Sequence, residues 1–284
     1  MSVAGAPLPA DGGQAPGQDA PAPVAMVGVR PVESWWFGSW CGLPVKGLMV
    51  WMAMLPAAWL LITLMPFAGW VTRTLGTLCH EMGHAAAALM VGRPALPIFD
   101  LTYGGGVTPI GERMWFLLLV YAVATVVLAR RWLEYPARLI AFGGLWAVMA
   151  LLIFTGWEET VFIEMGFGGQ VIAGGVFLYR ALTGEAEIYP GERWIYGLVG
   201  WCVLGQAAGM CWDVLYDAGF RAFYLGGKGG IDNDFVRLAD DHWIPLDSIT
   251  GWNLALSIVT PALVAGIALA LPRVRYLINL TTAR

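Results

Sequence analysis

The chain has 284 residues, of which 58% are hydrophobic and only 13% are charged. A soluble domain carries about 25% charged residues, so this composition favours a polytopic membrane protein over a soluble globular one. The formal net charge of −4 and the lack of a Lys/Arg cluster argue against a surface for nucleic acid. We expect an integral membrane protein whose first partner is the lipid bilayer, located in the inner membrane of a bacterium.

Residues 1–34 form a segment rich in Ala, Pro and Gly with few charges. Such a composition buries too little apolar surface to fold by itself, which predicts a disordered tail. The remainder, residues 35–284, is expected to form one integral membrane domain.

Long apolar runs predict about seven transmembrane helices, because each run approaches or exceeds the length that a helix needs to cross a bilayer. The predicted spans are 47–70, 74–91, 114–129, 139–156, 160–182, 194–216 and 252–271. Arg130, Arg131 and Arg138 fall in one short loop, and Arg273, Arg275 and Arg284 lie near the C-terminus, which predicts that both segments are in the cytoplasm. The segment 217–251 is then an acidic loop on the opposite side of the membrane.

The second run contains the sequence His80-Glu81-Met82-Gly83-His84. On a helix, positions i and i+4 lie one turn apart on one face, so both imidazoles can reach one tetrahedral metal ion. The HExxH pattern is typical of zinc peptidases, in which the glutamate acts as general base toward water. We therefore predict that His80 and His84 bind Zn²⁺ and that Glu81 is catalytic.

After this helix, residues 97–108 alternate in polarity and contain Gly104-Gly105-Gly106, which predicts a short strand and a turn or hairpin. The sequence HEMGHAAAALMVGRP, followed by this strand and GGGVT, resembles the site-2-protease class of membrane zinc metallopeptidases over residues 77–109. The resemblance implies a zinc cofactor and a membrane-protein or peptide substrate. The strand segment would pair with an unwound substrate strand by edge addition.

Two histidines need a further ligand to hold zinc. Members of the resembling class take it from an Asp-Gly motif on a later helix, but the only Asp-Gly in this chain is Asp11-Gly12 in the tail. Carboxylates inside apolar runs are rare and usually functional, so we predict Glu164 as the third ligand. Asp213, near the end of the sixth run, is the alternative.

Other polar residues are expected to face water. His242 lies among acidic residues in the 217–251 loop, and Glu158 and Glu159 follow Trp157 at the end of a span. The fifth run is rich in glycine, including Gly166 and Gly169. These glycines favour either close packing of the zinc helix or local unwinding.

The sequence thus predicts an all-α polytopic membrane protein of about seven transmembrane helices, with a small β-strand or hairpin element after the HExxH helix. The expected activity is that of a zinc-dependent intramembrane or membrane-associated peptidase. The alternative is a non-catalytic metal-binding membrane scaffold or regulatory protein, which would keep the His-Glu-His geometry without turnover.

Overall fold

The structure is a computed structural model that describes residues 39–40, 43–100, 105–133, 136–189, 191–227 and 232–282. All of them belong to one unit, Trp35–Arg284. The tail that the sequence predicts to be disordered, residues 1–34, lies outside the described residues.

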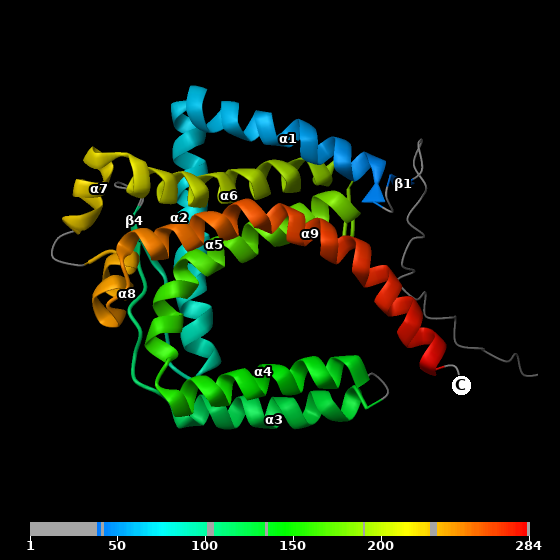
Figure 1. Cartoon of the computed structure of the whole chain (residues 1–284). Helices are drawn as coiled ribbons and strands as arrows, with labels where there is room; N and C mark the ends of the chain where they lie inside the picture. The colour runs from blue at the N-terminus through cyan, green and yellow to red at the C-terminus, as the bar shows by residue number, and fades with distance from the viewer. Residues whose placement is uncertain are drawn as a thin grey trace, which may run out of the picture. The chain divides into compact units, whose positions relative to one another are not determined.

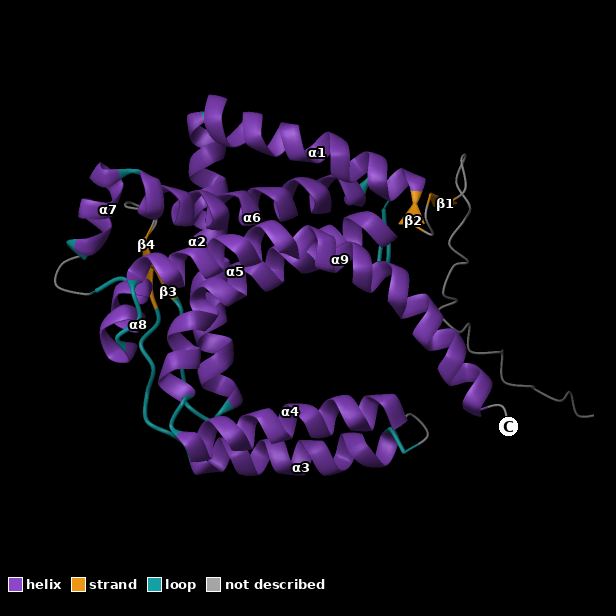
Figure 2. Cartoon of the chain, in the orientation of Figure 1, coloured by secondary structure: helices purple, strands orange, loops and turns teal. Residues whose placement is uncertain are grey.

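Helices make up most of the described chain (Figures 1 and 2). In chain order they are α1 (Val45–Leu64), α2 (Pro66–Met90), α3 (Trp115–Arg131), α4 (Pro136–Thr155), α5 (Glu158–Thr183), α6 (Glu192–Tyr216), α7 (Ala218–Leu225), α8 (Asp234–His242) and α9 (Leu246–Thr282). The predicted helical class is confirmed.

Four of these helices, α1, α5, α6 and α9, are long and apolar enough to cross a membrane. Helices α5 and α6 contact each other and both α1 and α9, and the four lie side by side in Figure 1. Buried apolar residues such as Leu178 and Val203 pack between them, whereas large apolar residues such as Met52, Trp59 and Ile258 are exposed. Contiguous exposed apolar surface is unusual on a soluble protein, so the arrangement fits an integral membrane protein.

The expected seven spans are not confirmed. Helix α3 has 17 residues, and the apolar part of α4 is the short stretch Leu139–Thr155. At 1.5 Å per residue, 17 residues cover about 26 Å, less than the roughly 30 Å hydrocarbon core. Helix α2 is longer but carries the charged and polar side chains of the HExxH pattern, so it is not among the four apolar helices.

Helices α1 and α2 divide at Pro66, inside the first apolar run. Pro66 occupies the first turn of α2, where the missing amide hydrogen of proline costs no hydrogen bond. The expected first span therefore ends at Leu64, and α2 begins at Pro66 instead of Thr74. Helix α2 runs across α5 and α6 in Figure 1, and it contacts both of them as well as α1.

Glycines allow α2 to pack closely against α5. A Cβ atom on Gly83 of α2 would overlap the carbonyl oxygen of Met165 and lie 2.9 Å from the Cα of Gly169 on α5. Helix α5 is continuous from Glu158 to Thr183, so the glycines serve close packing and not unwinding. This packing fixes the HExxH helix against α5.

The predicted hairpin after the HExxH helix is confirmed. Strands β3 (Ile98–Asp100) and β4 (Gly105–Val107) pair antiparallel, with Phe99 opposite Gly106. The connecting residues, 101–104, lie outside the described part of the chain. A second antiparallel pair, β1 (Ser39–Trp40) and β2 (Leu43–Pro44), precedes α1.

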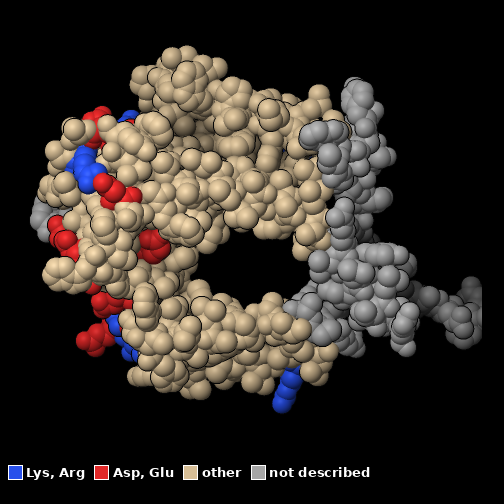
Figure 3. Space-filling model, in the orientation of Figure 1, with Lys and Arg blue, Asp and Glu red and all other residues tan. Residues whose placement is uncertain are grey.

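The 217–251 segment, expected as an acidic loop, contains two short helices. Helices α7 and α8 lie here, and α8 packs against α5 and α9. Most of the charged residues visible in Figure 3 gather at this end of the molecule, while the surface along the long helices is uncharged. The segment is therefore a folded part of the protein and positions side chains near α5.

Candidate metal centre

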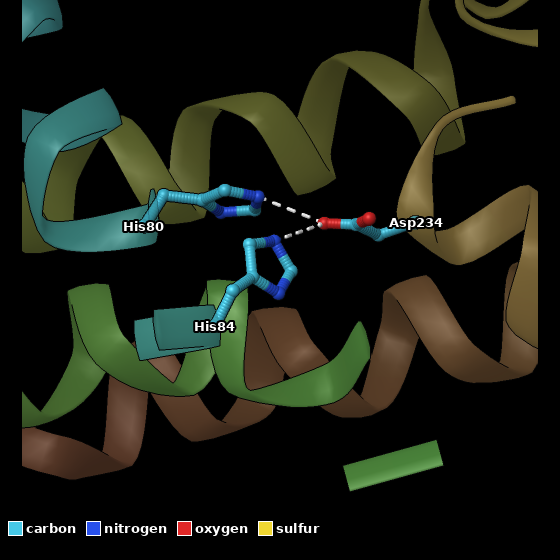
Figure 4. A group of neighbouring side chains, drawn as sticks. All are labelled: His80, His84 and Asp234. Carbon is cyan, nitrogen blue, oxygen red and sulfur yellow. Dashed lines mark hydrogen bonds and ion pairs between the residues drawn. The ribbon is translucent and has the colours of Figure 1, made fainter. Parts of the chain in front are cut away.

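Three side chains from two distant elements converge at one point (Figure 4). His80 and His84 extend from α2, and Asp234 is the first residue of α8. The Nε2 atoms of His80 and His84 lie 2.8 Å and 3.2 Å from Oδ2 of Asp234. Within the described chain, this is the group of His, Cys, Asp or Glu side chains whose ligand atoms are close enough to hold a metal ion.

The hydrogen bond of His84 determines which of its nitrogens faces Asp234. Its Nδ1 lies 2.5 Å from the carbonyl oxygen of Phe162, which can only accept a hydrogen bond, so Nδ1 carries the proton. In the neutral imidazole, Nε2 then directs a lone pair toward the Asp234 carboxylate. Two acceptors that face each other at 3.2 Å need a cation between them, either a proton or a metal ion.

The distances suit a tetrahedral metal ion. Ligand bonds of 2.0–2.2 Å place ligand atoms about 3.3 Å from one another around Zn²⁺. The 3.2 Å distance between Oδ2 of Asp234 and Nε2 of His84 is close to this value. The 2.8 Å distance from the same oxygen to Nε2 of His80 would increase by about half an ångström when a metal ion binds. A backbone carbonyl that orients a metal-binding histidine is also a common feature of metal sites.

Gly166 of α5 makes room for the two imidazoles. A Cβ atom at this position would overlap Cε1 and Nε2 of His84 and would lie 2.7 Å from Cε1 of His80. Helix α5 thus supports the site in two ways, because it supplies the Phe162 carbonyl and leaves space at Gly166.

Asp234 is ionised in this environment. Burial by itself raises the pKa of the carboxyl group. With no metal ion bound, protons on Nε2 of His80 and His84 supply hydrogen bonds and positive charge that outweigh burial and hold the pKa well below its usual range. A bound metal ion would supply the positive charge in their place. Asp234 also occupies the first turn of α8, where the helix dipole favours a negative charge. The site therefore offers two imidazole nitrogens and one anionic oxygen.

Glu81 lies beside the metal-binding group and is held by the β hairpin. The residue is 4% exposed, and its Oε2 accepts a hydrogen bond of 2.6 Å from the hydroxyl of Thr108. Gly106 of β4 passes so close that a Cβ there would lie 2.5 Å from Cγ of Glu81. The glycine run after the HExxH helix thus lets β4 cover this carboxylate.

The structure does not bring the carboxylates proposed from the sequence into this group. Glu164 is half-buried in α5 and lies near the side chain of Asn253 on α9, while Asp213 lies near the end of α6. Neither belongs to the group formed by the histidines and Asp234. The sequence reasoning missed Asp234 because it placed the residue in an extramembrane loop.

Two residues expected to be solvated are packed instead. Glu158 is buried at the start of α5 and forms ion pairs with Arg93 and Arg113. His242 lies in the last turn of α8, where its Nε2 is 2.8 Å from the hydroxyl of Thr160.

Comparisons with protein-family models, with curated proteins and with solved structures found no match to this chain. The geometry of the site is therefore the basis of the function proposed below.

Proposed function

We propose that the protein is a zinc-dependent peptidase of the membrane, in which His80, His84 and Asp234 hold the metal ion. The observation that carries the proposal is the convergence of two oriented imidazoles and an ionised carboxylate beside a buried glutamate. The HExxH spacing, the room that Gly166 leaves and the close packing of α2 on α5 all support the same geometry. We place the protein in the inner membrane of a bacterium.

Each residue of the site has a part in the proposed reaction. Zinc bound here would polarise the scissile carbonyl and lower the pKa of a water molecule. Glu81 accepts the proton of the attacking water and then delivers it to the nitrogen of the leaving amine. Thr108 keeps the Glu81 carboxylate oriented by its hydrogen bond. The carbonyl of Phe162 keeps the imidazole of His84 oriented in the same way.

The β hairpin supports a peptide in extended form as substrate. Strand β4 lies against Glu81, and its residues Gly106 and Val107 are exposed. A substrate segment that unwinds could add to an edge of this two-stranded sheet, so that main-chain hydrogen bonds present its carbonyl to the site. The exposed apolar helices support a substrate that is itself a membrane protein or a membrane-bound peptide.

Substitution of the general base separates this proposal from the alternative of a non-catalytic scaffold. In detergent-purified protein, Glu81→Gln should retain stoichiometric zinc and lose peptidase activity against a library of membrane-anchored peptides. Loss of about three orders of magnitude in rate is in the range expected for a general base. Wild-type protein that binds zinc but cleaves none of these peptides would support the scaffold instead.

A further inference from the structure

Helix α8, which carries Asp234, lies antiparallel to the first turns of α5. Near the start of α8, the ring of Phe235 packs against Phe167 with centroids 5.6 Å apart. One turn later, Leu238 shares a buried apolar cluster with Ile163. At the end of α8, His242 meets Thr160. As residue numbers rise along α8, the partners on α5 fall, which defines one register between the two helices.

The last turn of α8 is attached to α5 by two contacts of one side chain. Nε2 of His242 lies 2.8 Å from Oγ1 of Thr160, and the imidazole stacks on the indole of Trp157 with a centroid distance of 5.8 Å and an interplanar angle of 10°. The adjacent Asp241 is exposed. His242 is therefore the polar anchor of a short helix whose opposite end holds Asp234.

His242 and Asp234 lie at opposite ends of α8. Asp234 and His242 are eight positions apart, which is about 12 Å along a helix. A nine-residue helix is only marginally stable by itself, so its position depends on its contacts with other elements. At the other end, Asn233 donates a hydrogen bond of 2.6 Å to the carbonyl of Tyr224. Both ends of α8 are thus tied to neighbouring helices.

We propose that His242 fixes the position of α8 along α5 and thereby keeps Asp234 within reach of the two imidazoles. The inference rests on the proposed metal site, because Asp234 is taken as a ligand. It makes His242 a positioning residue that lies outside the metal site and touches no ligand. Release of His242 frees α8 to shift along α5, and the carboxylate then leaves the metal.

Two measurements test this on the full-length, detergent-purified protein. The first is the zinc dissociation constant, obtained by competition with a chelator. His242→Ala and Thr160→Val should each weaken zinc binding by roughly 10-fold, the lower end of the effect of losing an indirect support of a metal ligand. The double variant should be no weaker than His242→Ala, because the two changes break the same contact. Asp241→Asn, an exposed neighbour on the same turn, is the control and should bind zinc as the wild type does.

The second measurement is hydrogen exchange in the absence of zinc. His242→Ala should speed the exchange of amides in α8 while exchange in α6 stays unchanged, which excludes general unfolding. Zinc affinities within twofold of wild type in both single variants, with unchanged α8 exchange, would overturn the inference and leave the metal site intact. Wild-type protein that binds no zinc would instead refute the proposed function, and the exchange experiment would still decide whether His242 holds α8.

Discussion

Gly166 is the residue on which the placement of the two imidazoles depends most directly. Gly166→Ala places a Cβ in overlap with His84 and 2.7 Å from His80, whereas carbon contacts are favourable at about 3.5–4.0 Å. We predict that this variant lowers zinc affinity by roughly 100-fold or more, as measured by chelator competition. Alanine is a better helix former than glycine, so the loss would not come from a weaker helix.

Gly168→Ala is the matched control on the same helix. Its Cβ would meet only the side chain of Met165, with Sδ at 3.1 Å, and a methionine side chain can move aside. Zinc affinity in Gly168→Ala should equal that of the wild type. Equal affinity in Gly166→Ala as well would show that the imidazoles do not lie where the structure places them.

At the same scale, the sequence predicted two ligands of the candidate site and missed the third. His80 and His84 are four positions apart, so the period of an α-helix alone predicts that they share one face. Asp234 is 154 positions from His80, and no periodicity links the two. Its one signal was Asn233 before an amphipathic stretch with Phe235 and Leu238, which is typical of a capped helix that packs on a core.

Glu164, predicted as the third ligand, lies outside the group of ligand atoms. Its position in an apolar run suggested a metal ligand because a buried carboxylate is costly. In the structure the polar side chain of Asn253 on α9 lies near its carboxyl group and meets part of that cost, so a metal ion is not required to explain the residue. An intramembrane carboxylate can thus indicate contact between helices as well as a functional site.

At the scale of elements, Glu158 joins three segments around the site. It starts α5 and pairs with Arg93, which follows α2, and with Arg113, which precedes α3. Its side chain is 8% exposed, so loss of its charge leaves two partly buried arginines without an anionic partner. We predict that Glu158→Gln destabilises the protein by about 3 kcal/mol, the lower end of the range for a broken buried ion pair.

This destabilisation is measurable as a fall in the thermal midpoint of roughly 5 to 10 °C in detergent. The adjacent Glu159 is exposed, so Glu159→Gln should change stability by less than about 0.5 kcal/mol. Equal midpoints for the two variants would mean that the ion pairs do not stabilise the fold.

The bounds of the elements show what sequence reasoning can supply. Composition and apolar runs predicted the long helices, and the glycine run predicted the hairpin. The start of α2 was misplaced because Pro66 lies inside an apolar run, where hydropathy does not change. Four helices of the described chain have the length and apolarity of a membrane span, fewer than the seven expected, because α3 and the apolar part of α4 are short and α2 carries polar side chains.

At the scale of the whole molecule, α9 is the one membrane-length helix of the described chain between α8 and the C-terminal residues. It begins after α8 and ends near the C-terminus, and its part Leu246–Leu271 is long and apolar enough to cross a membrane. From the distribution of basic residues we expect the C-terminus to lie in the cytoplasm. We predict that a cysteine introduced at Asp232, in a variant without the native cysteines, is labelled from outside intact cells by an impermeant reagent.

A cysteine introduced at Arg284 in the same variant should be protected until the cells are permeabilised. Both positions should react after permeabilisation, which controls for accessibility of the thiols. Labelling of the C-terminal position in intact cells, with protection of position 232, would reverse the orientation.

The zinc content of purified protein tests the central claim most directly. Wild-type protein isolated in detergent should contain stoichiometric zinc, which His80→Ala and Asp234→Asn should both lose. Glu164→Gln should retain it, because that carboxylate does not belong to the group of ligand atoms. Zinc that persists in Asp234→Asn and disappears in Glu164→Gln would contradict the assignment, and wild-type protein without zinc would contradict the metal site itself.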